Sequence, residues 1–391
     1  MTTGERPARG WWAASLGLTL LVAILPQFAL GALGPQLRED LGLTPADLGL
    51  VFAALYAIGV LGSPVAGPLV DRVGGRRSCV ALLLTTGLAL LLASVADSGS
   101  GLALAMVPAG AAMAVANPGT NRWASAAPSA RTQATLVGVA QAGVQAGALV
   151  AGSLAAASAI GLDWRSAMRL GAVIALFGLV AAWRSPSDSP VSRRSGGPRA
   201  GLWSLPEPGA PRHLALYALL MGAGTSVVFA YLPTFGADVA GMSVAAAGAL
   251  AIVYGGTALV CRVGLGVLLR RPDELARPLL VGMSVGAALA IAMISFGRLG
   301  PGWLWAGAVL FGATGTTWPA IAFLAVVRVS PRGEAGRTTG WVAAAFYLGL
   351  WVGPPVAGQM IAIVGYGPVW FAAAVCYLAA LGPASAGRVA R

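Results

Sequence analysis

The chain has 391 residues, of which 57% are hydrophobic and only 10% are charged, and its mean hydropathy is +0.79. Soluble globular domains are about 25% charged, so this composition excludes that class and indicates a protein that crosses a membrane many times. The net charge of +12 comes from arginine alone, because the chain has no lysine. We interpret it as a belt against the membrane surface and not as a nucleic-acid site.

Uncharged apolar runs predict twelve membrane-spanning helices, because a helix needs about 20 apolar residues to cross the hydrocarbon core. A β-barrel would instead show alternation over about ten residues, so we expect an all-α membrane protein. Fifty uncharged residues separate Arg337 from Arg388, and "GYGP" at 365–368 supplies the turn that divides them into two spans. The predicted spans are 11–33, 48–70, 78–96, 101–123, 133–158, 166–183, 213–235, 244–268, 277–296, 302–327, 339–363 and 368–386.

The distribution of arginine predicts that both termini are cytoplasmic. With this orientation, twenty of the 25 arginines fall in inner segments and four in outer segments, while Arg262 lies inside the eighth span. This asymmetry satisfies the positive-inside rule. The first apolar run, 10–37, is too long for the core of a signal peptide, so we expect it to remain as the first span. Arginine-only basic content with abundant alanine and glycine favours a bacterial inner membrane as the location.

The loop between the second and third spans reads "GPLVDRVGGRR" at 67–77. Its glycines and charged residues are Gly67, Asp71, Arg72, Gly74, Arg76 and Arg77. A phosphate-binding loop of the Walker type would need a lysine, so we reject that reading. Two readings remain, namely a tight inner loop anchored by arginines and a gating element.

Polar residues at the depth of the membrane centre are the candidates for binding a solute. Asn117 lies on the fourth span, and Gln141 and Gln145 share one face of the fifth because they are four residues apart. Thr225 and Ser226 lie at the centre of the seventh span, and Arg262 lies in the inner half of the eighth. The amides could instead make interhelical hydrogen bonds, and Arg262 could reach the interface or pair with a loop.

Aromatic residues of the tenth and eleventh spans could provide walls for the same site. Trp318 precedes Pro319 in "TGTTWP" at 314–319, where a proline leaves backbone groups to be satisfied locally or by a ligand. Tyr347 and Trp351 lie on the eleventh span, and packing alone is the alternative role of all three aromatic residues. Three dispersed cysteines and a single histidine, His213, predict no disulfide and no metal site.

The chain is predicted to consist of two halves joined by a linker. Residues 184–212 are rich in proline, glycine and arginine and read as a cytoplasmic loop. They separate an N-terminal six-helix bundle, 1–183, from a C-terminal one, 213–391. A shift of 199 residues places Gly67 on Gly266 and Arg72 on Arg271, which indicates an internal repeat.

Two parallel six-helix repeats and the motif at 67–77 resemble the major facilitator superfamily (MFS). The resemblance implies alternating access, with a site between the halves. It also implies that Gly67 lets the second span approach the eleventh, and that Asp71 caps the start of that helix, near Thr338 and Thr339, when the inner side is closed. "NPGTNRW" at 117–123, "QAGVQAG" at 141–147 and "DWR" at 163–165 resemble the cyanate-transporter-like branch, whose members move small anions or small polar heterocycles.

No Asp or Glu lies near the middle of a predicted span, so we expect a neutral or anionic small organic solute. The predicted activity is secondary active or facilitative transport, with a coupling proton left open. The expected partners are the solute and the lipid bilayer, with no cofactor and no nucleic acid, and the chain is expected to be a monomer. The alternative is an exporter of a drug or secondary metabolite. It is favoured by "GWVAAAFYLGLWVGPPVAG" at 340–358, which is similar to an antiporter signature, and disfavoured by Met106, which stands where antiporters usually have arginine.

An enzyme or a receptor is the remaining class of alternatives. An enzyme would need clustered acids, histidines or cysteines at membrane depth, and a receptor usually adds a soluble output domain. The sequence offers neither, so we expect no enzyme.

Overall fold

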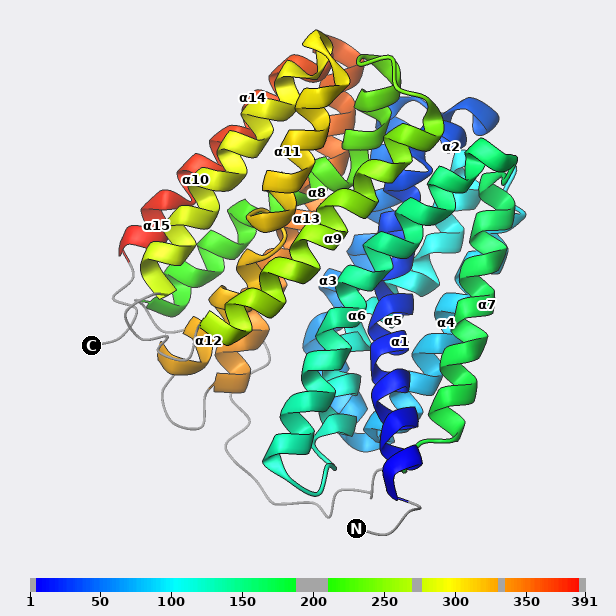
Figure 1. Ribbon diagram of the computed structural model, residues 1–391, viewed down its shortest axis with the longest axis vertical. Helices are drawn as coiled ribbons and strands as arrows, with labels where there is room; N and C mark the ends of the chain where they lie inside the picture. The colour runs from blue at the N-terminus through cyan, green and yellow to red at the C-terminus, as the bar shows by residue number, and fades with distance from the viewer. Residues whose placement is uncertain (1–4, 188–209, 269–275, 330–334, 387–391) are drawn as a thin grey trace.

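The structure, a computed structural model, describes residues 5–187, 210–268, 276–329 and 335–386 (Figure 1). Helices account for almost all of this part of the chain. Those of the first half are α1 (Glu5–Ala32), α2 (Gly34–Leu41), α3 (Pro45–Val73), α4 (Gly75–Ser94), α5 (Gly99–Ala124), α6 (Ala130–Ala156), η1 (Ala157–Ile160) and α7 (Trp164–Trp183). Those of the second half are α8 (Ala210–Asp238), α9 (Val244–Leu268), α10 (Ala276–Ser295), η2 (Phe296–Leu299), α11 (Pro301–Ala313), α12 (Trp318–Val329), α13 (Ala335–Val364), α14 (Tyr366–Ala379) and α15 (Leu381–Ala386).

The all-α membrane fold is confirmed, and eleven helices among the described residues are long and apolar enough to cross a bilayer. They coincide with the predicted spans to within a few residues. The exception is 302–327, which was predicted as one continuous helix but is divided into α11 and α12. The count of twelve crossings therefore depends on taking these two helices as the halves of one crossing. The short helix α2 was not predicted, because its eight residues include three charged ones and form no apolar run.

The helices group into two bundles that follow the two halves of the chain. In Figure 1 the blue-to-green helices α1–α7 lie to one side and the green-to-red helices α8–α15 to the other. The main contacts between the bundles join α3 to α13, α6 to α9 and α1 to α8. The bounds of the linker, 184–212, stay a prediction, since most of that segment lies outside the described residues.

Within the described residues, the bundles pack closely at one end of the molecule and lie apart at the other. We call this end, which carries α2 and the connection from α6 to α7, the closed end. A Cβ atom added at Gly49 would lie 2.6 Å from the Pro354 carbonyl oxygen, and one at Gly152 would lie 2.6 Å from the Ile252 nitrogen. At the opposite end, where the chain begins, a Cβ at any of four glycines of the same helices would meet nothing within 4 Å. These four are Gly67, Gly138, Gly264 and Gly340. We call this the open end, and Figure 1 shows the bundles diverging toward it.

The glycines of α13 are explained by close packing. A Cβ at Gly349 or at Gly353 would overlap atoms of α8, and one at Gly358 would lie 2.5 Å from the Pro45 carbonyl oxygen of α3. The spacing that resembles an antiporter signature thus allows one helix to touch two neighbours at backbone distance.

Candidate functional site

The break between α11 and α12 places non-helical backbone at the depth of the membrane centre. Such backbone must be satisfied inside the protein or line a cavity. The hydroxyl groups of Thr316 and Thr317 donate to the Gly312 carbonyl, at 3.0 and 2.8 Å. The Thr225 hydroxyl of α8 donates to the Gly315 carbonyl at 3.0 Å. Side chains therefore satisfy carbonyls of the broken turn, as the Trp-Pro pair at its end predicted.

Arg262 of α9 satisfies the remaining carbonyl of the break. Its Nη2 donates to the Thr316 oxygen at 2.7 Å. The Gln145 amide of α6, oriented so that its oxygen faces the guanidinium, accepts from Nη2 at 3.1 Å and from Nε at 3.3 Å. Arg262 therefore joins the broken helix of the second bundle to a buried amide of the first.

The positive charge of Arg262 is not neutralised by a carboxylate among the described residues. A guanidinium has five N–H donors, and the contacts above use the Nε donor and both Nη2 donors. The two donors on Nη1 have no partner within this part of the chain. The side chain is partly exposed. A guanidinium with free donors at membrane depth could bind an anion.

A second polar group continues this site toward the open end. The Gln141 amide donates to the Asn117 side-chain oxygen at 3.0 Å, which confirms the interhelical hydrogen bond that was the alternative to substrate binding. The Tyr347 side chain of α13 lies near the same Asn117, across the seam between the bundles. Because Gln141 and Gln145 are one turn apart on α6, this amide pair and Arg262 form one polar strip along the seam.

Of four other predicted residues, three are buried and one is exposed in this structure. Ser226 is buried and donates to the Ala223 carbonyl of its own helix at 2.9 Å. Trp318 is fully buried, with its ring 5.5 Å from that of Tyr217, and its indole N–H has no partner among the described residues. Thr225 is buried and holds the break, whereas Trp351 is 36% exposed, one turn from Tyr347.

Several central residues were missed by sequence reasoning. The Tyr56 hydroxyl donates to the Gln27 side chain at 3.0 Å, and both residues are buried. Gln27 follows Pro26 within the first span, so a polar residue beside a proline was the signal that could have found it. On the closed-end side the rings of Phe28 and Phe229 meet edge to face at 4.9 Å, and Tyr254 and Phe311 pack around them. This aromatic cluster closes the seam between the bundles.

The glycines of the loop at 67–77 have clear backbone roles. Gly74 has a φ of +95° between α3 and α4, a conformation that favours glycine. A Cβ at Gly75 would overlap the Trp123 backbone. Arg76 donates to the carbonyls of Ala182 and Trp183 at the end of α7, both at 2.9 Å. These contacts fit the reading of this loop as a structural anchor.

Among the described residues, the acid of the same loop has its ion pair within its own bundle. Asp71 Oδ1 lies 3.9 Å from Arg122 Nε of α5, and the Asp71 side chain is 72% exposed. Arg72 and Arg77 are exposed. Gly67 faces open space because the seam is open at this end, and Arg271 of the repeat lies outside the described residues. The gating role assigned to Asp71, which requires a closed inner side, stays a prediction.

Asp71→Asn is expected to slow transport several-fold while leaving membrane insertion and the melting temperature unchanged. In the other access state, in which the bundles meet at the end that is open here, the Asp71 carboxylate would stabilise the N-terminus of α13. The substitution removes this contact, which is on the order of 0.3–1 kcal/mol, or more when partly buried. Uptake by reconstituted protein, compared with the amount inserted, measures this effect. Flux equal to that of the unmodified protein would remove Asp71 from the mechanism.

The motif "DWR" at 163–165 forms helix caps at the closed end. Asp163 caps α7 by accepting from the Ser166 N–H at 3.0 Å, and its hydrogen bonds with Ser166 lower the pKa of its carboxyl. The Trp164 indole donates to Asp40 at 2.7 Å, and Arg165 donates to the Ala96 carbonyl at 2.6 Å. The motif therefore stabilises the first bundle and contacts no part of the Arg262 site.

Comparison with known proteins adds a family to this geometry. The family model described as "Major Facilitator Superfamily" matches residues 16–327. A "Probable nitrate/nitrite transporter" of Mycobacterium tuberculosis is 28% identical over 371 residues, which cover 88% of each chain. A "3-(3-hydroxy-phenyl)propionate transporter" of Escherichia coli is 30% identical over 166 residues, or 41% of each chain.

Solved structures share the fold at low sequence identity. A nucleoside transporter superposes with a TM-score of 0.78 at 14% identity, over 96% of this chain and 99% of that one. A D-xylose-proton symporter superposes with a TM-score of 0.74 at 16% identity, over 97% of each chain. At these identities the similarity establishes the arrangement of helices and nothing about the solute.

Proposed function

Since the chain belongs to the Major Facilitator Superfamily, we propose that it carries a small monovalent anion by alternating access. Members of this family are multi-pass membrane transporters, so the chain is a transporter and not an enzyme. The observation that carries the proposal is Arg262, a cation at membrane depth without a carboxylate partner among the described residues. An uncompensated charge at this depth is unfavourable, and a bound anion would neutralise it. A neutral solute would leave that charge unpaired.

The charge of the site favours a single negative charge on the solute. Arg262 is the one cation of the polar strip formed with Gln145, Gln141, Asn117 and Tyr347 within the described residues. The names of the two curated relatives refer to anions, namely nitrate or nitrite and a substituted propionate. These names agree with the choice of an anion but do not choose between an inorganic and an organic one.

The orientation and energy source belong to the same proposal. We place the closed end outside and both termini in the cytoplasm of a bacterial cell, in its inner membrane. The reason is that the described connections α3–α4 and α5–α6, which lie at the open end, are rich in arginine. We also expect a monomer. Among the described residues, the polar strip has no carboxylate that could carry a coupling proton. Such a proton would have to be carried by the solute or by a group outside the polar strip. The branch that includes cyanate transporters remains a prediction.

Uptake into proteoliposomes tests the proposal. The purified chain is reconstituted and offered nitrate, nitrite and benzoate, with benzamide as the neutral counterpart of benzoate and protein-free vesicles as the blank. Saturable uptake of at least one anion, without saturable uptake of benzamide, is expected. Equal saturable uptake of benzamide would contradict the choice of an anion. A lack of saturable flux for every anion would contradict the proposed cargo class.

A further inference from the structure

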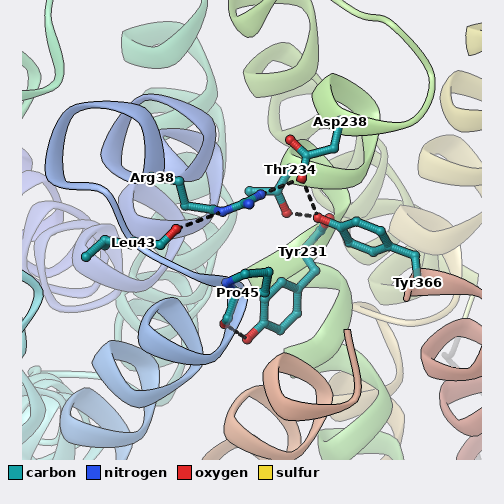
Figure 2. A network of polar contacts seen from close by, with 7 residues as sticks. All are labelled: Arg38, Leu43, Pro45, Tyr231, Thr234, Asp238 and Tyr366. Atoms are coloured by element: carbon teal, nitrogen blue, oxygen red, sulfur yellow. Dashed lines mark hydrogen bonds and ion pairs between the residues drawn. The ribbon is translucent and has the colours of Figure 1, made fainter. Parts of the chain in front are cut away.

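A polar cluster at the closed end joins the two bundles (Figure 2). Arg38 of α2 forms an ion pair with Asp238 at the end of α8, through Nη1 and Oδ2. The Tyr366 hydroxyl of α14 donates to the same carboxylate oxygen at 2.9 Å. Arg38 Nε donates to the Leu43 carbonyl at 3.3 Å, so the first bundle holds the guanidinium in place while it faces the second.

Tyr231 of α8 makes a second connection deeper in the same seam. Its hydroxyl lies 2.9 Å from the Pro45 carbonyl oxygen of the first bundle and 2.8 Å from the Pro354 carbonyl oxygen of the second. The residue is fully buried. A Cβ at Gly49 would lie 2.7 Å from this hydroxyl and one at Gly358 would lie 2.5 Å from it, so both glycines make room for it.

We propose that Arg38, Asp238, Tyr366 and Tyr231 form a lock, here called the closed-end lock, which sets how often the empty transporter opens at this end. The ion pair and the Tyr231–Pro45 hydrogen bond each join one bundle to the other, so both must break when the bundles separate there. Tyr366 strengthens the lock from within the second bundle. Its hydroxyl donates to Asp238 and so holds that carboxylate in the position in which it pairs with Arg38. The lock is independent of the cargo and requires only that the transporter exchanges between its two access states.

The exposure of the groups predicts which part of the lock is stronger. The Arg38 and Asp238 side chains are 21% and 38% exposed, so water screens the ion pair. An exposed pair of this kind shifts an equilibrium by about two- to fivefold. The Tyr231 hydroxyl is buried, so water does not compete for its hydrogen bond to the Pro45 carbonyl, and the loss of that bond has the larger effect, on the order of tenfold.

The test measures the distance between spin labels at the closed end. Ile160 and Leu299 are 88% and 72% exposed on opposite bundles, so cysteines there can carry labels without disturbing the packing. The native cysteines, Cys79, Cys261 and Cys376, are first replaced by alanine. Asp238→Asn is expected to raise the long-distance population about two- to fivefold, and Tyr231→Phe about tenfold. Exchanging the charges, with Arg38→Asp and Asp238→Arg together, is expected to restore most of the short distance.

A matched control lies on the same short helix. Asp40 is two residues from Arg38, but it accepts from Trp164 within its own bundle. Asp40→Asn is therefore expected to lower the melting temperature without changing the distance distribution. Unchanged distributions in both Asp238→Asn and Tyr231→Phe would overturn the lock, as would an equal shift in Asp40→Asn. Because no solute is added, this result is separate from the outcome of the anion proposal.

Discussion

Arg262→Gln is expected to reduce saturable anion uptake at least about 30-fold. Truncating one partner of a desolvated charge pair costs about 2–5 kcal/mol, which corresponds to a factor of roughly 30 to several thousand. Thr225 still satisfies the Gly315 carbonyl in this variant, so the break between α11 and α12 should persist. The loss is measured as kcat/KM in proteoliposomes for whichever anion the unmodified protein carries.

One further variant separates the charge of Arg262 from its shape, and another is a control at an exposed arginine. Arg262→Lys keeps the charge without the planar fork, so it should retain more uptake than Arg262→Gln. Arg131→Gln removes an exposed arginine near the open end and should leave uptake within about twofold of the unmodified protein. Unchanged kcat/KM in Arg262→Gln would exclude Arg262 as the anion ligand.

Gly31→Ala is expected to open the closed end and to abolish transport. A Cβ at Gly31 of α1 would overlap the Phe229 carbonyl oxygen of α8, so the two bundles could not approach as they do here. Overpacking typically costs 1–3 kcal/mol, and a clash with backbone cannot be relieved by a change of rotamer. The equilibrium should therefore shift at least about tenfold toward the long distance between labels at Ile160 and Leu299.

Gly143→Ala is the matched control for this prediction. Its Cβ would overlap the Gly17 carbonyl oxygen, but Gly17 and Gly143 both belong to the first bundle. This variant should lower the melting temperature and leave the label distance unchanged. A short label distance in a folded Gly31→Ala protein would show that the contact between α1 and α8 does not decide closure.

The candidate site was predictable in its residues but not in their pairing. Gln145 and Arg262 could be placed on two spans, and the Trp-Pro pair marked the position of the break in the tenth. That Gln145 holds Arg262 against Thr316 could not be predicted, because the three residues lie on two helices and a helix break whose relative positions are set by packing. The direction of Trp318 was equally hidden, since a tryptophan beside a proline can face a pathway or the core.

The sequence by itself determined that this chain is a many-helix membrane protein, and it placed nearly every span. Each span can be recognised from its own sequence, because a segment enters the bilayer only if it is long and apolar enough to cross it as a helix. Tertiary structure alone decided which end is closed and which residues meet there, such as Arg38 with Asp238 and Tyr231 with Pro45. Those contacts depend on how helices distant in the sequence pack against one another, and hydrophobicity and local pattern do not fix that packing.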